Sequence, residues 1–585
     1  MQRENINTQN NPAPRGGIDR RSFLTGTAAL GAVAALGTLA GCASKSADET
    51  APTKTAGEGG TADGTMTAQA AQQKWSFEIP PEPIADDQIA ETIEDDVVVV
   101  GAGVSGLVTA LSAAEAGASV TLICAGTAPV ARGGTFHAFK STLLQEVGLG
   151  SPYDGIIGEF FKKEMMAANW NIDQRKWYKF YHNSEEAMNW LLEKMKAAGH
   201  TCVIENFVPD GNAGVNTSVV GGHSFMGGEI VSTGMGGPLV TSTLVAEGEK
   251  AGVTYLYSTT ARQLVRDDDG AGRVSAVIAE RSDGTFAKFV ASKGIVLATG
   301  DFSGDKEMVA KYCPSVLPFL LENKDTYDAQ FQFGGLMPGD GQKMGLWIGA
   351  AWQHAEQCTP MVFTGGPTAT ASPQTGLLMD AHGERFGNED MTNSFLANAL
   401  LQLPDQAAYG IWDASAASQF KWPAAGPYGS GTMEPADAIA AWEAACEQKN
   451  AVLVKGDTVE DVAQKLGLPV EATKATVDRY TQLAEAGADE DFFKRSELLN
   501  PIKEAPFYGM KYKGEDMLTI MGGLRTNADM QVCDENDEPI EGLYNVGTMV
   551  GDMYSNLYTL LVPGFNLGGT CLTFGYLTGR ALAQK

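Results

Sequence analysis

The sequence predicts an α/β fold with a parallel sheet at its core. The continuous apolar run Val97–Val100 is typical of a strand that is buried on both faces. A glycine-rich turn at 101–106 follows it, and residues 107–117 then carry apolar side chains at helical spacing and end in a glycine. A second apolar segment, 119–124, returns as a strand. This strand–turn–helix–strand order predicts a Rossmann-like dinucleotide-binding unit.

The glycines of the turn have distinct expected tasks. Gly101 makes the tight turn, Gly103 lets the backbone approach a pyrophosphate, and Gly106 lets the helix pack closely on the strand. The N-terminus of the helix then faces the phosphates. The second strand lacks the usual terminal carboxylate for the adenosine ribose, so we expect Thr127 or backbone carbonyls to take that place. The pattern therefore predicts a bound dinucleotide.

Three further segments favour FAD over a nicotinamide cofactor. The sequence Arg132-Gly133-Gly134-Thr135 is a second glycine-rich loop that is placed to approach the cofactor. Residues 293–300 form a buried strand that ends in a turn of small residues, and residues 542–548 repeat this design. A Rossmann unit closed by such late segments holds an extended, non-covalent FAD. The expected FAD contacts in these segments are Gly133, Gly134, Thr135, Ala298, Thr299, Gly300, Gly547 and Thr548.

Composition excludes several other classes of protein. The 585 residues exceed one ordinary core, so two or more domains are expected. A net charge of −29 disfavours nucleic-acid binding. The 8 cysteines form no C-x-x-C pair and the 6 histidines no H-x-x-x-H pair, so haem attachment, cysteine-clustered iron–sulfur centres and a metal site have no support in the sequence. A second redox group must therefore come from another molecule.

The N-terminus resembles an export signal. Arg20-Arg21 precedes the apolar run 28–40, as in twin-arginine (Tat) signals, and Leu39-Ala40-Gly41-Cys42 resembles a lipobox with Cys42 as the acylated residue. The alternative is a chance basic region with an incidental cysteine. We expect a signal at 1–42, a flexible tether at 43–92, export by the Tat translocase and a lipid anchor on the outer face of the cytoplasmic membrane.

The later motifs resemble those of the fumarate reductase/succinate dehydrogenase flavoprotein superfamily. The sequences at 339–341 (Gly-Asp-Gly), 383–389 (Gly-Glu-Arg-Phe-Gly-Asn-Glu) and 521–524 (Met-Gly-Gly-Leu) occur in that family's order, and the resemblance covers about residues 93–585. Within that family the chain most resembles the exported branch with one flavin domain. The ending 573–576 is similar to that of ketosteroid dehydrogenases.

That resemblance implies a division into domains. A Rossmann-like FAD-binding domain in two segments, 93–301 and 506–585, would enclose an inserted α+β capping domain at 302–505. The substrate would lie between the cap and the flavin. Asp340, Ala298 and the loop residues Gly564, Asn566 and Leu567 would contact FAD, whereas Arg385 and Glu389 would hold the cap together.

The sequence departs from the family where fumarate would bind. Asn393, which is counted among the candidate catalytic residues, stands at the position of the arginine that serves as the family's acid. Leu518-Thr519-Ile520 replaces a histidine before Met-Gly-Gly, and a second arginine of the family falls at about Val562. A dicarboxylate would be costly to bind in such a cation-poor site. A larger, neutral or aromatic substrate is expected instead. The alternative for each aromatic residue taken singly is a place in the core. The residues expected around the substrate are Met553, Tyr554, Tyr558, Leu560, Leu561, Val562 and Phe565 of the loop and Phe331, Phe333, Trp347, Trp352 and Phe363 of the cap.

Tyr558 or Tyr554 is the candidate proton donor, because a phenol can protonate or stabilise an enolate; the alternative is that both are packing residues.

The favoured function is an FAD-dependent respiratory reductase that acts on CH–CH groups, transferring hydride to the activated double bond of a neutral or aromatic molecule. The alternatives are a ketosteroid-type dehydrogenase, a fumarate or enoate reductase proper, and a flavin- or ligand-binding lipoprotein without turnover. Electrons would arrive from a separate membrane or multihaem cytochrome or a flavin carrier.

Overall fold

A computed structural model describes most of the chain beyond the N-terminal signal. The described residues are 75–131, 133–149, 154–205, 218–230, 234–316, 337–364, 376–419, 422–423, 432–448, 451–513 and 516–585. The twin-arginine segment, the lipobox, Arg132, Phe331 and Phe333 lie outside them. Residues Gln73–Lys585 form one compact unit. Within the described part of the chain, no helix has the length and apolar character needed to cross a membrane.

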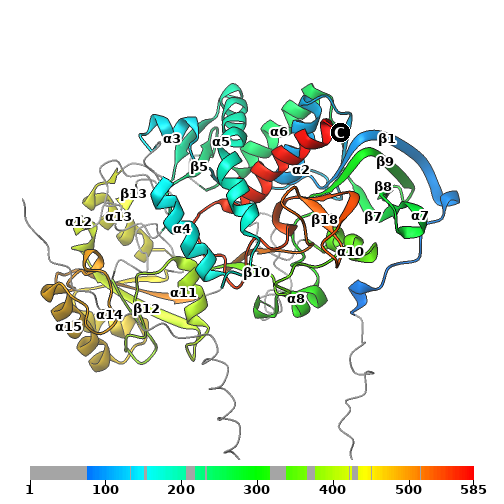
Figure 1. Cartoon of the computed structure of the whole chain (residues 1–585). Coiled ribbons are helices and arrows are strands. Elements are labelled where there is room, and N and C mark those ends of the chain that lie inside the picture. Colours follow the sequence, from blue (N-terminus) through cyan, green and yellow to red (C-terminus); the bar gives the residue numbers. More distant parts are fainter. Residues whose placement is uncertain are drawn as a thin grey trace, which may run out of the picture. The chain divides into compact units, whose positions relative to one another are not determined.

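An eight-stranded sheet forms the centre of the dinucleotide-binding half (Figure 1). Its strands run in the order β18-β19-β9-β1-β2-β6, and β8 joins β9 to β7 beside this path. Strand β1 pairs in parallel with β2 and β9, with Val97 opposite Val120. Residues 97–100 are buried, as the apolar run predicted. The strands are β1 (Ile89–Val100), β2 (Val120–Ile123), β6 (Thr254–Leu256), β7 (Thr259–Arg266), β8 (Val274–Arg281), β9 (Phe286–Leu297), β18 (Gln531–Cys533) and β19 (Pro539–Asn545).

Helices from both ends of the chain pack together beside this sheet. Helix α2 (Val104–Glu115) contacts α6 (Gly237–Ala251) and the C-terminal α16 (Phe574–Ala583), which Figure 1 shows running alongside it in red. Helix α5 (Gln174–Ala197) lies against α6 and α16, and α4 (Asp154–Ala167) precedes it. The short helices in this half are α3 (Thr142–Glu146), α7 (Asp267–Gly270), α8 (Lys306–Tyr312) and α10 (Asp340–Trp347).

The segment before β1 is packed on the protein, which corrects part of the predicted tether. Residues 75–88 carry two short 3-10 turns, η1 (Ser76–Glu78) and η2 (Asp86–Gln88), and β1 already starts at Ile89. Phe77 is buried, and its carbonyl accepts a hydrogen bond from Trp347 Nε1 at 2.8 Å. The tether prediction rested on polar composition, but one buried aromatic side chain anchors the end of this stretch.

A second sheet forms the core of the inserted half. Four antiparallel strands are ordered β11-β12-β16-β15, and the buried Trp412 and Trp442 pack on one face of them. Strand β16 begins at Phe507, just past the predicted boundary at 505/506, yet it pairs with β12 along its whole length and therefore belongs to this sheet. The elements are β11 (Leu377–Met379), β12 (Ala407–Asp413), β15 (Leu453–Gly456), β16 (Phe507–Lys513), α11 (Asn393–Leu400), α12 (Ala416–Gln419), α13 (Pro435–Cys446), α14 (Val459–Leu466) and α15 (Val470–Ala486).

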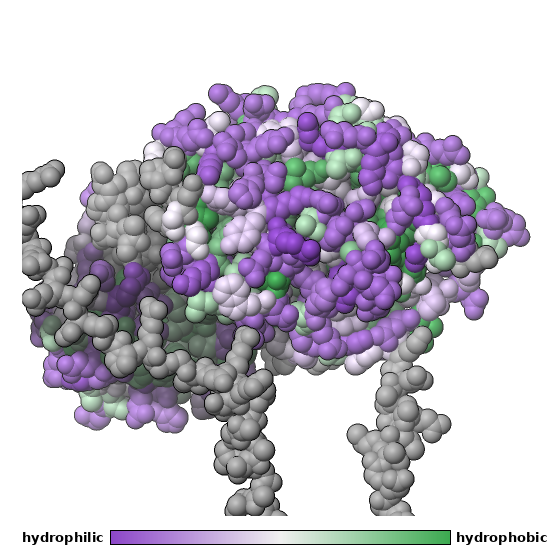
Figure 2. Space-filling model, in the orientation of Figure 1, coloured by the Kyte–Doolittle hydropathy of each residue, from purple (hydrophilic) through white to green (hydrophobic). Residues whose placement is uncertain are grey.

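Smaller sheets complete the architecture. One has the order β3-β5-β4, and a two-stranded ribbon of β10 and β17 carries the predicted Met-Gly-Gly motif at its end. Figure 2 shows mainly hydrophilic side chains on the face it displays, with apolar residues scattered among them. The remaining elements are β3 (Thr135–His137), β4 (Thr201–Ile204), β5 (Gly222–Met226), β10 (Thr359–Phe363), β17 (Asp516–Met521), β13 (Trp422–Pro423), β14 (Thr432–Met433), the 3-10 turns η4 (Pro314–Val316), η6 (Ser496–Leu498) and η7 (Gly547–Met549), and the π-helical η8 (Asn566–Thr573).

Candidate active site

The turn between β1 and α2 brings the backbone close to its neighbours. A Cβ atom at Gly101 would lie 2.3 Å from the carbonyl oxygen of Ala298, and one at Gly106 would lie 1.9 Å from the carbonyl oxygen of Gly101. Both distances are far inside van der Waals contact, so only glycine fits at these two positions. The predicted reasons for Gly101 and Gly106, a tight turn and close packing of helix on strand, agree with this geometry.

Gly103 differs from these two glycines, because the space that its side chain would occupy is open. A Cβ atom there would approach only the carbonyl oxygen of Val130, at 4.0 Å. Gly103 is the N-cap of α2, no side chain caps that helix end, and its first turn has no acidic residue. The first backbone N–H groups of a helix lack partners within the helix and attract anions. The open approach and the uncapped helix end fit a pyrophosphate.

The second glycine-rich loop packs on a glycine run that the sequence reading overlooked. Gly134 lies against the backbone of Gly234 and Gly236, and the N–H of Gly237 donates to the carbonyl oxygen of Gly133 at 3.2 Å. The sequence Gly-Met-Gly-Gly-Pro before α6 was the signal that could have revealed this partner. The two runs hold each other's backbone at van der Waals distance.

The late segments converge on the same region. Gly341 packs against the Thr299 side chain, and Gly547 packs against Ser105 in the first turn of α2. The Gln342 side chain donates to the carbonyl oxygen of Gly300 at 2.9 Å. The structure thus brings the ends of β9 and β19 and the start of α10 to the N-terminus of α2. Residues more than 400 positions apart in the sequence form one cradle around it.

The side chain of Asp340 faces a different space from the cradle glycines. It lines a cavity of about 310 Å³ together with Arg262 and Trp347, and burial raises the pKa of its carboxyl. Its neighbour Gly341 makes the contact with Thr299. The backbone of the Gly-Asp-Gly motif therefore reaches the cradle, whereas the direct FAD contact expected of Asp340 stays a prediction.

The loop before η8 covers the second glycine-rich loop. Gly564 lies against the backbone of Thr135, and its carbonyl oxygen accepts from the His137 N–H at 3.0 Å. Leu567 reaches the Gly133 side of the loop. The carbonyl oxygens of Asn566 are occupied within the π-helix, because Thr570 Oγ1 donates to both the backbone and the side-chain oxygen. The predicted FAD-contacting loop thus lies beside the second glycine-rich loop.

The two candidate tyrosines lie together in an aromatic cluster. Tyr558 is fully buried and Tyr554 is 3% exposed, with their ring centroids 4.7 Å apart. The backbone N–H of Asn566 donates to the Tyr558 hydroxyl oxygen at 3.4 Å, so the pair is connected to the loop before η8. Burial is the main cause that raises the pKa of Tyr554 well above its usual value, and Tyr558 adds to this by a hydrogen bond.

Helix α5 fixes the chain that leads to these tyrosines. The indole of Trp177 donates to the Met553 carbonyl oxygen at 2.8 Å and stacks on Phe565 at a centroid distance of 4.1 Å. The fully buried Lys176 donates to the Gly551 carbonyl oxygen at 2.8 Å. Burial lowers the pKa of Lys176, although Asp552 and Asp173 oppose this. The cation nearest this segment is therefore engaged with backbone and carboxylates.

A buried glutamate beside the tyrosines was missed in the sequence. Glu164 on α4 is 2% exposed and accepts a hydrogen bond from Thr559 Oγ1 at 2.6 Å. Burial raises the pKa of its carboxyl to about 8, so it holds its proton at neutral pH. The surrounding Lys-Lys-Glu-Met-Met sequence is typical of a solvated helix face, and no local signal distinguishes this glutamate.

Asn393 lies at the start of α11, where it serves the cap. Its side-chain oxygen accepts from the backbone N–H of Thr364 at 3.0 Å and from the Thr364 hydroxyl. A neutral amide does not titrate and cannot act as a general acid. The preceding residue makes the contact with the tyrosine loop, because Thr392 Oγ1 donates to the Thr559 carbonyl oxygen at 2.6 Å. Asn393 thus has a structural partner, and its predicted catalytic role has no support from these contacts.

Two tryptophans assigned to the substrate site belong elsewhere. Trp352 stacks on Tyr312 at a centroid distance of 3.8 Å, and Trp347 donates its indole N–H to Phe77 in the N-terminal segment. Both join the core that anchors residues 75–88, which corrects their predicted place beside the flavin. Aromatic residues are commonly buried in cores, and sequence position alone did not separate the two cases.

The cap cluster around Arg385 is built as expected. The guanidinium donates to Glu389 at 2.9 and 2.8 Å and to Asp489 at 3.1 and 2.8 Å. The side chains of both carboxylates are fully buried. Arg385 holds the pKa of Asp489 below its usual range. The arginine therefore ties the predicted motif to the end of α15.

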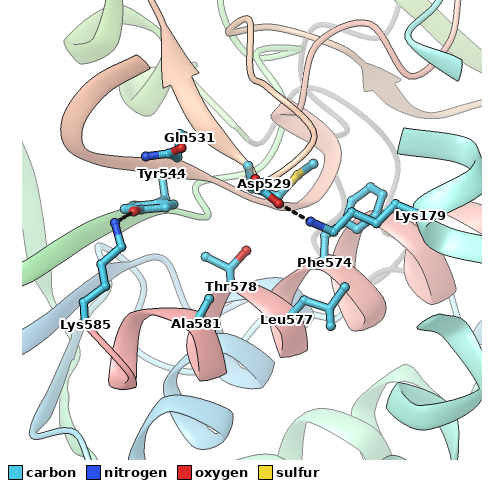
Figure 3. Close-up of a pocket in the computed structure, with 10 residues that line it drawn as sticks. Lys179, Asp529, Gln531, Tyr544, Phe574, Leu577, Thr578, Ala581 and Lys585 are labelled. Atoms are coloured by element: carbon cyan, nitrogen blue, oxygen red, sulfur yellow. Dashed lines mark hydrogen bonds and ion pairs between the residues drawn. The ribbon is translucent and has the colours of Figure 1, made fainter. Parts of the chain in front are cut away.

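A further cavity lies between α16 and the β18–β19 edge (Figure 3). It measures about 230 Å³, and Figure 3 shows Lys585 pointing to the Tyr544 hydroxyl and Lys179 to Asp529. The Lys179–Asp529 ion pair measures 2.5 Å. None of its lining residues is among the predicted site residues. The cavity is therefore separate from the cradle.

Comparisons with known proteins agree with this geometry. Residues 96–560 match the family of FAD binding domains, and residues 17–37 match the signal sequence of the twin-arginine translocation pathway, which directs export. A vinyl phenol reductase from Lactiplantibacillus plantarum is 26% identical over 83% of this chain and 94% of its own. An NADH:fumarate oxidoreductase from Klebsiella pneumoniae is 26% identical over 84% of this chain, which spans only 48% of that longer relative.

A solved structure shows the same fold. The 3-ketosteroid-Δ4-(5α)-dehydrogenase from Rhodococcus jostii superposes with a TM-score of 0.63 at 24% identity and covers 86% of this chain and 100% of its own. The match over residues 96–560 spans most of the chain, and it includes Gly101, Gly300 and Gly547 of the cradle. The chain belongs to the FAD binding domain family, within the fumarate reductase/succinate dehydrogenase flavoprotein superfamily, and is an FAD-dependent oxidoreductase acting on CH–CH groups.

Proposed function

We propose that this protein is an exported reductase that saturates the activated C=C bond of a neutral or aromatic small molecule. The observation that carries the proposal is the buried tyrosine pair, which lies in an apolar aromatic cluster directly beside the loop that precedes η8. Bound FAD supplies the hydride chemistry. The chain itself must orient the acceptor, exclude water and deliver one proton.

The electrostatics of the tyrosine loop support a neutral substrate. Residues 547–579 contain neither arginine nor lysine, and the nearby Lys176 is occupied by Gly551 and acidic neighbours. Two carboxylates brought there would lose water without gaining a bidentate cation. The position of the second family arginine holds Val562, which is fully buried. Vinyl phenol, the substrate in the name of one relative, has the size and neutrality that this environment favours.

Tyr558 is the better of the two candidate proton donors. Its oxygen receives the Asn566 N–H, and its hydrogen bond with Tyr554 raises the pKa of Tyr554. Tyr554 therefore retains its proton and donates a hydrogen bond to the Tyr558 hydroxyl oxygen. Negative charge is then stabilised on the Tyr558 oxygen. A phenol oxygen that accepts hydrogen bonds is better able to carry the charge that is left when its proton moves to the substrate.

We further propose the cofactor mode, the location and the electron source. FAD is held without a covalent bond. Of the two histidines beside the glycine loops, His223 is engaged at both ring nitrogens, with Nδ1 2.8 Å from the Gly221 carbonyl oxygen and Nε2 2.7 Å from Ser141 Oγ, and His137 Nδ1 lies 2.9 Å from the Pro563 carbonyl oxygen. Cys42 carries a lipid anchor outside the cytoplasmic membrane. A separate haem or flavin carrier delivers the electrons in anaerobic respiration.

The test is anaerobic oxidation of reduced methyl viologen by the FAD-loaded protein, with vinyl phenols, cinnamates, steroid enones and fumarate as acceptors. We expect turnover of a neutral acceptor and none of fumarate. Tyr558→Phe should lower kcat by about 10²-fold or more, as for loss of a positioned acid. Tyr544→Phe, a buried tyrosine on β19, serves as the control and should keep wild-type kcat.

Rapid reduction of fumarate would show that the site does hold cationic groups for a dicarboxylate and would refute the neutral-substrate assignment. A second candidate function, a ketosteroid-type dehydrogenase, is favoured by the common fold with the Rhodococcus enzyme. It predicts the reverse reaction: reduction of an artificial dye by a saturated ketosteroid, with the same loss in Tyr558→Phe.

A further inference from the structure

The tyrosine pair is isolated from solvent, which creates a need for a proton source. Tyr558 is fully buried and Tyr554 is 3% exposed, inside a cluster that includes Phe161, Trp177 and Phe565. A tyrosine that protonates a substrate becomes a phenolate, and a buried phenolate is costly without a proton donor nearby. Each turnover therefore requires a second acid within the protein that can restore the phenol.

Glu164 is placed to be that acid. It lies on α4 between Phe161 and Met165, both of which belong to the same apolar cluster as the tyrosines. Its carboxyl interacts electrostatically with Tyr554 and accepts the Thr559 hydroxyl at 2.6 Å. Thr559 directly follows Tyr558 in the chain. The mechanism built on the tyrosines makes no other use of this buried carboxyl.

The surroundings keep the Glu164 carboxyl neutral. Burial has the largest effect and raises the pKa of this carboxyl. The hydrogen bonds from the Thr559 hydroxyl and the backbone N–H of Val562 lower the pKa by less. From the tyrosine loop, the titratable group that faces it is Tyr554. On α5, Lys176 is directed to the Gly551 carbonyl oxygen. On α4 itself, Lys162 and Lys163 are exposed.

The direction of proton transfer follows from the two acids. Burial raises the pKa of Glu164 to about 8, whereas the pKa of Tyr554 lies well above its usual value of 10. A proton on Glu164 therefore moves downhill in free energy to a Tyr554 phenolate, which forms when Tyr554 passes its own proton to Tyr558. The O–H bond of the Glu164 carboxyl breaks and the O–H bond of the phenol forms. The carboxylate then takes up a proton that enters from the exposed side of α4, where the neighbouring Lys162 and Lys163 reach solvent.

We propose that Glu164 is the internal acid that returns a proton to the Tyr554–Tyr558 pair after each turnover. The inference rests on the proposed function, because it assumes that a tyrosine of this pair protonates the substrate. Glu164 does not touch the substrate in this scheme and acts through the tyrosines.

The same contact couples the acid to the cap. Thr559 gives its hydroxyl to Glu164 and its carbonyl oxygen to Thr392, at 2.6 Å in both cases. Thr392 is the N-cap of α11 in the inserted half. The residue that positions the acid thus also contacts the cap, so we expect the relay to be assembled only when this cap contact is made.

The experiment compares Glu164→Gln with Glu159→Gln, which changes an exposed glutamate on the same helix. Infrared difference spectra of the FAD-loaded proteins between pH 5 and 9 follow the protonated carboxyl band without any acceptor. Wild type and Glu159→Gln should show protonated-carboxyl intensity that disappears near pH 8. Glu164→Gln should lose the part contributed by Glu164 and keep the part contributed by the buried Glu205. Glu164→Asp should keep a carboxyl band.

Steady-state assays with a neutral acceptor test the relay itself. Glu164→Gln should lower kcat about tenfold or more with KM unchanged, and Glu164→Asp should restore part of the rate. In wild type, kcat should fall as pH rises through about 8, because the donor loses its proton, and this alkaline limb should be absent in Glu164→Gln.

Three outcomes would overturn the inference. One is equal protonated-carboxyl intensity at pH 7 in wild type and Glu164→Gln, even if the enzyme reduces its acceptor, in which case the proposed function stands alone. Another is a wild-type kcat and pH profile in Glu164→Gln. If the band is present but no acceptor is reduced, the proposed function fails and removes the need for a relay.

Discussion

The sharpest test of the cofactor cradle is Gly103→Ala. The added methyl group would approach only the Val130 carbonyl oxygen, at 4.0 Å, and Gly103 has extended backbone angles that alanine also adopts (φ −79°, ψ 177°). The fold should therefore tolerate the change. Loss of a favourable N-cap residue costs about 1 kcal/mol of unfolding free energy at most.

The cost to FAD binding should be larger than the cost to folding. The methyl group would stand at the uncapped end of α2, where backbone N–H groups are free to bind the pyrophosphate. A lost hydrogen bond to a charged group costs about 1.5–3 kcal/mol, which corresponds to about a ten- to hundredfold weaker Kd. The affinity of the apoprotein for FAD, followed by quenching of flavin fluorescence, measures this effect.

Two controls bracket that result. Gly155→Ala introduces the same methyl group in α4, where nothing lies within 4 Å, and should bind FAD as wild type does. Gly106→Ala forces a contact of 1.9 Å with the Gly101 carbonyl oxygen and should disturb folding itself. If Gly103→Ala binds FAD with wild-type affinity while remaining folded, the pyrophosphate does not lie at this helix end and the cradle assignment is wrong.

Two further predictions concern buried charge. Arg385→Leu removes the cation shared by the buried Glu389 and Asp489 and leaves only Lys494, 3.7 Å from Glu389. It should lower the free energy of unfolding by about 3–5 kcal/mol, measured by urea denaturation; a loss below 1 kcal/mol (about the size of a surface pair) would contradict this. Glu205 is 1% exposed and burial raises the pKa of its carboxyl from 4.5 to about 8, so the unfolded chain releases this proton first and stability should fall as pH rises from 4.5 to about 8. In Glu205→Gln that slope should be shallower by up to about 1.4 kcal/mol per pH unit, and equal slopes would refute the assignment.

Local sequence was sufficient for the dinucleotide-binding half of the fold. The valine run, the three glycines and the helical spacing after them are short-range patterns, and each reflects a physical need of neighbouring residues in the chain. For that reason β1, α2 and β2 were predicted in the right order and place, although β1 starts at Ile89, inside the stretch predicted as tether, and α2 spans Val104–Glu115 instead of 107–117. The twin-arginine pattern is likewise local, and the match at residues 17–37 confirms it.

Burial and long-range pairing were decided only by the tertiary structure. Nothing in the local sequence distinguishes Glu164 from an exposed helical glutamate such as Glu159, because its burial depends on a loop almost 400 residues later. The same limit applies to Trp352, whose ring stacks in the core beneath the N-terminal segment, and to β16, which continues the cap sheet past the predicted boundary. Sequence fixes the chemistry that each residue can offer, whereas the fold sets its solvent and its neighbours, and these determine whether a carboxyl keeps its proton.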